Sequence, residues 1–236
     1  MSTDSITLDN SFNPSALDLV LALLATFILP ITAYFLFTIF GALIPLFLYY
    51  GGFCFAIVYW RRGTIEYRKT FTLMTKYFIG FFVFELILIV ISTQTYKFTA
   101  NFELFGFLLT LIIWAPINGF SEQLIWIYVY DVFDKLTGSR FGKNMGIIIG
   151  LFFYFTLIGL IHILFWAQFL FEAETIKVIP WTYILLSSQF VVAIGYLVAY
   201  KKSKSMWPVF FLHVLTDIGA VLLTGYSILP DLVQFL

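Results

Sequence analysis

Six ionisable side chains lie within long apolar stretches of this sequence, where a charge is costly. A charged residue at the centre of a bilayer costs about 2.5–3.5 kcal/mol on insertion scales, and such residues are candidate functional groups by default. The chain has only two histidines, and both belong to this set. One of them, His213, precedes Asp217 by one helical turn, which puts both on one face of a helix. The six are Asp18, Glu85, Glu122, His162, His213 and Asp217.

A glutamate with two histidines is sufficient to activate a water molecule. The carboxylate can take the proton of the water, one imidazole can orient it, and the other, with a polar neighbour, can stabilise an oxyanion. Glu122, His162 and His213 could instead hold a divalent metal ion. The chain contains no HExxH zinc-peptidase signature. The same groups could also serve as interhelical hydrogen-bond partners.

Two of the acidic residues have simpler structural interpretations. Asp18 is expected at the water interface, close to the start of the first apolar stretch. Glu85 is expected to make a structural polar contact between helices. The single cysteine, Cys54, can form no internal disulfide and is interpreted as a small buried hydrophobe.

The composition is that of an integral membrane protein. Of 236 residues, 61% are hydrophobic and only 11% are charged, whereas soluble domains carry about 25% charged residues. The mean hydropathy is +0.98. The net charge is zero, so no basic face suggests a nucleic-acid partner. No positively charged n-region of a signal peptide is visible, because no Lys or Arg precedes Arg61.

The hydrophobic pattern predicts an all-α membrane helix bundle of about seven transmembrane helices, with six to eight as the range. A polar tail at 1–15 precedes a single transmembrane domain at 16–236. A span needs about 20 apolar residues, so residues 16–60 form two spans with a break between Gly41 and Pro45. Pro30 is expected to kink the first span and Pro116 to interrupt the fourth. The remaining spans are predicted near 76–91, 105–130, within 145–171, near 179–200 and near 207–226.

Basic residues alternate between the predicted loops. Ten Lys or Arg follow spans two, four and six, whereas the alternate loops hold only Lys97 and Lys177. The cytoplasmic excess of Lys and Arg therefore predicts a multi-pass protein of the cell membrane with its N-terminus cytoplasmic and its C-terminus outside.

Three short motifs on separate spans resemble those of the CPBP intramembrane protease family, the group of the type II CAAX-prenyl proteases, also called Abi proteins. That family carries EExxxR with an aromatic residue before the Arg, then FxxxH, then HxxxN or HxxxD. The matching segments here lie within 105–225 and are "EQLIWI" from Glu122, "IGLIH" ending at His162, and "HVLTD" from His213, after "SMWPVFFL".

The resemblance implies a role for each matching residue. Glu122 corresponds to the glutamate that activates water, and His162 to the histidine that helps to hold it. His213 and Asp217 correspond to the oxyanion-stabilising pair. The family is understood as glutamate-dependent and free of catalytic metal, so no cofactor is expected, with a divalent metal at Glu122, His162 and His213 as the minor alternative.

Two positions depart from the family pattern. The second Glu of the first motif is Gln123 and its Arg is Ile127. Residues four apart on a helix face each other, so the two changes together remove an ion pair without leaving one charge unpaired. Gln123 and Ile127 are therefore predicted to lie away from the cavity. Restoring both charges should be tolerated better than Ile127→Arg alone.

Helix rise poses a problem for a shared site. If the cytoplasmic loops begin at Asp131 and end at Lys204, Glu122 and His213 each lie nine residues, or roughly 13 Å, from a loop. His162 lies 19 residues after Lys143, or roughly 28 Å from its loop. The three groups would meet only if the fifth span were tilted or began late, for which Gly146 and Gly150 offer an irregular start.

Three functions fit these features. The first is an intramembrane endopeptidase that cleaves a membrane-associated peptide or protein substrate near the cytoplasmic face. The second is a catalytically silent relative that positions another membrane or envelope protein, which the changes at Gln123 and Ile127 favour. The third is a transporter with a Glu and His proton relay, although no inverted repeat is visible.

Overall fold

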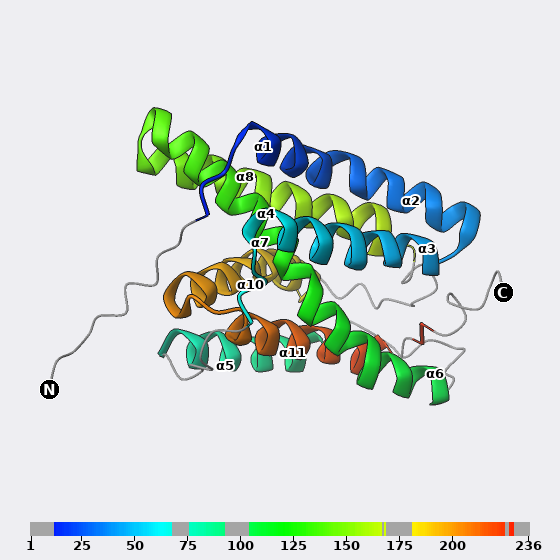
Figure 1. Cartoon of the computed structure of the whole chain (residues 1–236). Helices are drawn as coiled ribbons and strands as arrows, with labels where there is room; N and C mark the ends of the chain where they lie inside the picture. The colour runs from blue at the N-terminus through cyan, green and yellow to red at the C-terminus, as the bar shows by residue number, and fades with distance from the viewer. Residues whose placement is uncertain are drawn as a thin grey trace, which may run out of the picture.

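The protein is a bundle of helices in which one long helix crosses between two layers (Figure 1). The computed structural model describes residues 12–67, 76–92, 104–166, 168, 181–224 and 227–228, and these contain no strand. Several rods join α-helical and π-helical (η) segments. They are α1 Ala16–Leu23, η1 Leu24–Ile28 and α2 Leu29–Phe40; α3 Leu43–Leu46, η2 Phe47–Ile57 and α4 Val58–Arg62; α5 Lys76–Ser92; α6 Leu104–Leu109, η3 Thr110–Trp114 and α7 Ala115–Phe141; α8 Lys143–Ile161 and η4 His162–Trp166; α10 Trp181–Ser203; and α11 Trp207–Thr224.

The described rods match the seven predicted segments. Four are long and apolar enough to cross a membrane, Ala16–Phe40, Leu43–Arg62, Leu104–Phe141 and Lys143–Trp166. The chain is therefore an all-α membrane helix bundle, and α5, α10 and α11 complete it. The first predicted break falls at Gly41, whose φ of 72° suits a residue without a side chain.

The prediction that Pro116 interrupts the fourth span needs correction. Pro116 does not interrupt the fourth span, because Leu104–Phe141 is one continuous helical rod. Pro116 lies in the first turn of α7, directly after the π-helical η3. Pro30 occupies the same position in α2 after η1. Local π-helical geometry can accommodate the backbone groups that a proline leaves unpaired, so the fourth span continues as a helix where an interruption was expected. The expected kink at Pro30 stays a prediction.

Helix α7 is the centre of the bundle. It contacts α1 and α8 on one side and α11 on the other, and in Figure 1 it separates the layer of α1–α4 and α8 from the layer of α5, α10 and α11. Almost every residue from Ser121 to Phe133 is buried, on all faces of the helix. A helix buried on all sides is typical of the core of a large bundle, and it can present polar side chains to both layers.

Two glycines allow α7 and α8 to approach closely. These helices form an antiparallel hairpin around Gly142, whose φ is 91°. A Cβ added at Gly146 would lie 2.8 Å from Gly138 Cα and 2.9 Å from Gly138 N, and it would also meet the Asp134 carbonyl. Because these are backbone atoms, no side-chain rotation could relieve the contact.

We expect Gly146→Ala to lower the free energy of unfolding by about 1–3 kcal/mol, the usual cost of overpacking. Gly159→Ala is the matched control, because it lies on the same helix and an added Cβ would meet nothing within 4 Å. The control should gain stability from the better helix propensity of Ala. Thermal unfolding of both variants in detergent tests this, and equal effects would refute the close approach.

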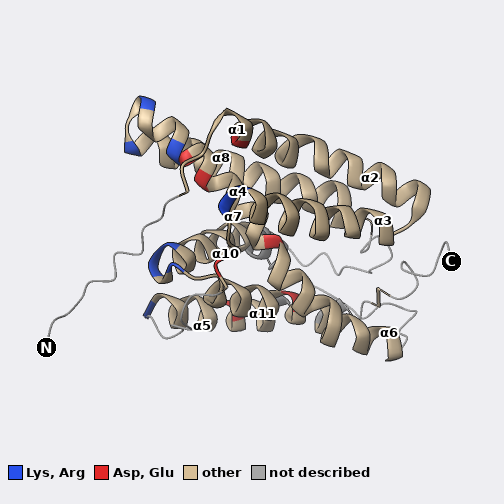
Figure 2. Cartoon of the chain, viewed as in Figure 1, with Lys and Arg blue, Asp and Glu red and all other residues tan. Residues whose placement is uncertain are grey.

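Buried charges fix the basic end of the bundle. Asp18 is fully buried rather than facing water, and it bonds Arg61 at 2.9 Å and the Tyr128 hydroxyl at 2.8 Å. Asp131, which was expected in a loop, is buried within α7 and bonds Arg62 and Lys201, each at 2.7 Å. The described Lys and Arg gather toward this same end (Figure 2).

The remaining structural expectations can be compared directly with the structure. Cys54 is buried and free, as predicted. The end of the predicted polar tail packs on the bundle, with the Phe12 ring 5.7 Å from the Tyr128 ring. Arg68, Lys69, Lys97 and Lys177 lie outside the described residues.

Candidate functional site

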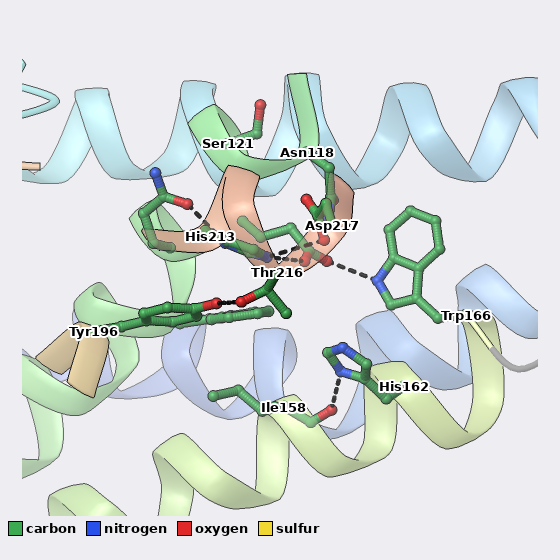
Figure 3. A network of polar contacts seen from close by, with 12 residues as sticks. Asn118, Ser121, Ile158, His162, Trp166, Tyr196, His213, Thr216 and Asp217 are labelled. Carbon is green, nitrogen blue, oxygen red and sulfur yellow. Dashed lines mark hydrogen bonds and ion pairs between the residues drawn. The ribbon is translucent and has the colours of Figure 1, made fainter. Parts of the chain in front are cut away.

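Glu122 lies at the middle of the bundle with no exposed surface. Its Oε1 accepts a hydrogen bond of 2.7 Å from the indole of Trp166, at the end of η4. Its Oε2 lies 3.4 Å from His213 Nε2 on α11. The carboxylate thus has one oxygen toward the indole of Trp166 and the other toward the imidazole of His213, both of which are labelled in Figure 3.

The ring of His213 is oriented by contacts on three sides. It stacks against Trp126 and Tyr196, with centroid distances of 5.0 and 5.1 Å. Nδ1 lies 3.1 Å from Gln123 Oε1. Nε2 lies 3.8 Å from Asp217 Oδ1 on the next turn of α11. Both nitrogens therefore face oxygen atoms.

Asp217 is held by an amide one turn before Glu122. The Asn118 side chain donates to Asp217 Oδ2 at 3.0 Å. The orientation of that amide is set in turn by the Tyr50 hydroxyl, which donates to Asn118 Oδ1 at 2.7 Å. Asp217 thus lies in a fixed position beside the imidazole of His213.

The hydrogen bonds around Gln123 assign the protons of His213. The Tyr67 hydroxyl donates to the Phe120 carbonyl at 2.9 Å and accepts from Gln123 Nε2. Burial raises the pKa of Tyr67, which follows the second span, so this hydroxyl keeps its proton. Gln123 Oε1 is then left to accept the Nδ1–H of His213.

One further proton must lie between His213 and Glu122. Nε2 faces a carboxylate oxygen of Glu122, and Asp217 is the other oxygen group nearby. An unprotonated Nε2 and a carboxylate oxygen are both hydrogen-bond acceptors and do not attract each other. A proton therefore lies either on Nε2 or on one of the carboxyl groups. The pair Glu122–His213 therefore holds an acidic proton beside a basic carboxylate, which is the requirement for acid–base chemistry.

The prediction that Gln123 lies away from the cavity is wrong, because Gln123 contacts His213 directly. Ile127, the other residue that was expected away from the cavity, is fully buried, and its backbone carbonyl accepts from Arg62 Nη2 at 3.3 Å. Gln123 thus brings a neutral amide, which both donates and accepts, into contact with the site.

His162 lies one helix away from the pair. It is the first residue of η4, directly after α8, its side chain is exposed, and its Nδ1 bonds the Ile158 carbonyl at 2.7 Å. Its ring rises from α8 toward the cluster in Figure 3, with the centroid 6.0 Å from that of Trp126. Its predicted role in holding water stays a prediction.

The long α7 removes the helix-rise problem. α7 continues to Phe141 instead of ending near Asp131, and α8 begins at Lys143. Glu122 is as many residues before the end of α7 as His162 is after the start of α8. In an antiparallel hairpin the two residues therefore lie at the same depth, without the tilt or late start that was expected.

Four residues of the cluster were not predicted from the sequence: Tyr67, Asn118, Gln123 and Trp166. Asn118 could have been found, because it precedes Glu122 by one turn and so shares its face. Tyr67 follows the second rod and Trp166 ends the rod of α8 and η4. No sequence pattern around either residue marks it as part of a site. Among the residues that the structure describes, no group of three or more His, Cys, Asp or Glu is arranged to hold a metal ion.

Gln123→Leu tests the proton assignment. In the wild type we expect His213 to carry a proton on Nδ1, because Gln123 accepts it. In the variant this preference should disappear. With only two histidines in the chain, ring ¹⁵N chemical shifts of ¹⁵N-histidine-labelled protein report it.

Ser121→Ala is the control for this experiment. Ser121 is a buried neighbour whose hydroxyl bonds the Ile117 carbonyl. Its replacement should leave the His213 shifts unchanged. An unprotonated Nδ1 in the wild type would refute the assignment.

The fold and the site define a class, a membrane helix bundle with a glutamate, a histidine and an aspartate in contact at its centre. No protein-family model, no curated protein and no solved structure matches the chain.

Proposed function

We propose that this protein is an intramembrane, glutamate-dependent endopeptidase of the CPBP type, which cleaves peptide or membrane-protein substrates near the cytoplasmic face of the cell membrane. The observation that carries the proposal is the 3.4 Å approach of the Glu122 carboxylate to the Nε2 of His213 inside an apolar bundle. The order of the three sequence motifs supports the same conclusion.

The reaction is a hydrolysis that needs one base and one acid. Glu122 takes a proton from water, and the hydroxide attacks the carbonyl carbon of the scissile peptide bond. His213, protonated on Nε2, donates to the developing oxyanion, while Asp217 balances the imidazolium charge. The C–N bond then breaks, and the proton held by Glu122 passes to the leaving amine.

Water and substrate must reach Glu122 for this chemistry. The Trp166 indole now occupies Oε1, and the exposed His162 belongs to the same segment, η4. Displacement of Trp166 would free Oε1 to bind the attacking water, with His162 beside it. No metal or other cofactor takes part in this sequence of steps.

The position of the basic residues supports the orientation. The described Lys and Arg gather toward one end of the bundle, where Figure 2 shows the blue segments. The cytoplasmic preference of Lys and Arg puts this end inside the cell. The N-terminus is then cytoplasmic and the C-terminus outside.

Incorporation of ¹⁸O tests the proposal. Membranes that contain the protein and membranes that lack it are incubated in H₂¹⁸O, and released peptides are analysed by mass spectrometry. Hydrolysis puts one ¹⁸O atom in each new carboxyl terminus. We expect labelled termini that depend on the protein, and their absence would contradict a peptidase.

A silent scaffold is the second candidate, and a specific observation favours it. Glu122 is completely buried, and Oε1 is bonded to an indole in place of water. In that case the buried cluster would serve to hold α7, η4 and α11 together, and the protein would bind another membrane or envelope protein through its surface.

A further inference from the structure

Glu85 lies in a second polar cluster on the far side of α11 from Glu122. It is at the middle of α5, with Phe81 one turn before and Ile89 one turn after. A Cβ added at Gly195 would meet the Phe81 ring at 2.6 Å, and one added at Gly219 would meet Ile89 at 2.5 Å. The face of α5 that carries Glu85 is therefore pressed into α10 and α11.

Within the part of the chain that the structure describes, no cation is paired with Glu85. Only 3% of the residue is exposed, and neither carboxylate oxygen has a hydrogen-bond partner among the described residues. The polar groups that interact with it are the Thr216 hydroxyl, the Asp217 carboxylate and Tyr196. Asp217 adds a second negative charge rather than a positive one. An ionised carboxylate in this position would cost several kcal/mol.

The neighbouring hydroxyl protons are already committed. Thr216 Oγ1 donates to the Leu212 carbonyl at 3.3 Å. The Tyr196 hydroxyl lies 2.7 Å from Thr216 Oγ1, so with the Thr216 proton used, Tyr196 is the donor of this pair. Both oxygens retain lone pairs but no free proton. The cluster thus offers acceptors to Glu85, which suits a carboxylic acid and not a carboxylate.

We infer that Glu85 is a proton-binding site, which carries its proton in the folded protein at neutral pH beside the Tyr196–Thr216 pair. The titratable groups that face it are Tyr196 from α10 and Asp217 from α11. Because Asp217 also contacts His213, loss of this proton would place a second negative charge near the imidazole. The protonation state of Glu85 therefore changes the proton affinity of His213, and the protonation state of His213 changes that of Glu85 to the same extent. The inference does not depend on peptidase activity.

Infrared spectroscopy of the full-length protein in detergent at neutral pH tests the inference. A protonated carboxyl group has a C=O stretching band separate from that of a carboxylate. We expect one such band to disappear in Glu85→Gln. It should persist in Asp134→Asn, the control, because Asp134 is partly exposed and lies 3.6 Å from Lys201. A folded Glu85→Gln protein that retains every acid band would overturn the assignment.

A second measurement covers the case in which Glu85→Gln does not fold. Labelling the protein with glutamate that carries ¹³C in its side-chain carboxyl group shifts the infrared C=O bands of Glu without moving those of Asp. In a Glu122→Gln background, we expect a protonated glutamate band that shifts with the label. Its absence there would show that Glu85 is ionised and would refute the proposal.

Discussion

Glu122→Gln is expected to lower the rate of peptide cleavage by about 10²- to 10⁴-fold, the usual loss on removing a general base. The variant should remain folded. The new amide oxygen can accept from the Trp166 indole, as Glu122 Oε1 does. Its NH₂ group can donate to Nε2 of a neutral His213, because the Nδ1 proton is already directed to Gln123. The substitution thus removes the base and keeps the contacts.

The measurement compares wild type, Glu122→Gln and His213→Ala, expressed at matched levels. Released peptides and the cellular phenotype are followed together, and thermal unfolding reports folding. Ser121→Ala is the control on the same helix, because its hydroxyl bonds only the Ile117 carbonyl among the described residues. A full phenotype with Glu122→Gln would favour the scaffold, for which surface changes should abolish function.

His213→Ala needs a separate interpretation. Its ring contacts Trp126 and Tyr196, so its loss leaves a cavity between aromatic side chains. Truncating a large buried side chain to Ala typically costs several kcal/mol. Lost cleavage in this variant is informative only if its unfolding temperature stays close to that of the wild type.

Much of the fold follows from apolar length and helix breakers. Stretches of about 20 apolar residues predict spanning helices, and Gly41 marks a break because its backbone adopts a positive φ. The contact of Glu122 with His213 could also be anticipated, because buried ionisable groups must find partners. For these features, local sequence and burial are sufficient.

The end of α7 could not be predicted by the same reasoning. Residues 131–141 are polar and were assigned to a loop, yet they continue the helix to Phe141. Their helical state depends on α8, which packs against them through Gly138 and Gly146. Hydropathy detects where apolar residues accumulate, but it does not detect a polar helix that a neighbouring helix supports.

The position of Gln123 was missed for a different reason. The two departures from the resembled motif, at Gln123 and Ile127, predict a neutral pair remote from the site. The amide instead joins Tyr67 and His213, which come from segments far apart in the sequence. Such a contact depends on how α11 and the end of the second rod approach α7, and no local pattern encodes that approach.

Asp131→Leu is expected to destabilise the bundle by about 3–5 kcal/mol, the usual cost of removing one partner of a buried ion pair. The expectation rests on Arg62, whose side chain is only 2% exposed and bonds Asp131 at 2.7 Å. Without the carboxylate, the acceptors left to Arg62 among the described residues are neutral, the Ile127 carbonyl and the Tyr200 hydroxyl. Denaturant unfolding in detergent gives the free energy change.

The second cation bonded to Asp131 provides the matched comparison. The Lys201 side chain is 29% exposed and also lies near Asp134, so it can reach water when Asp131 is removed. Lys201→Met should therefore cost no more than about 1 kcal/mol. The double variant Asp131→Leu with Arg62→Met should recover most of the lost stability, because no buried charge then lacks a partner. If the double variant is as unstable as Asp131→Leu alone, the unpaired guanidinium is not the cause, and the loss comes from packing around α7.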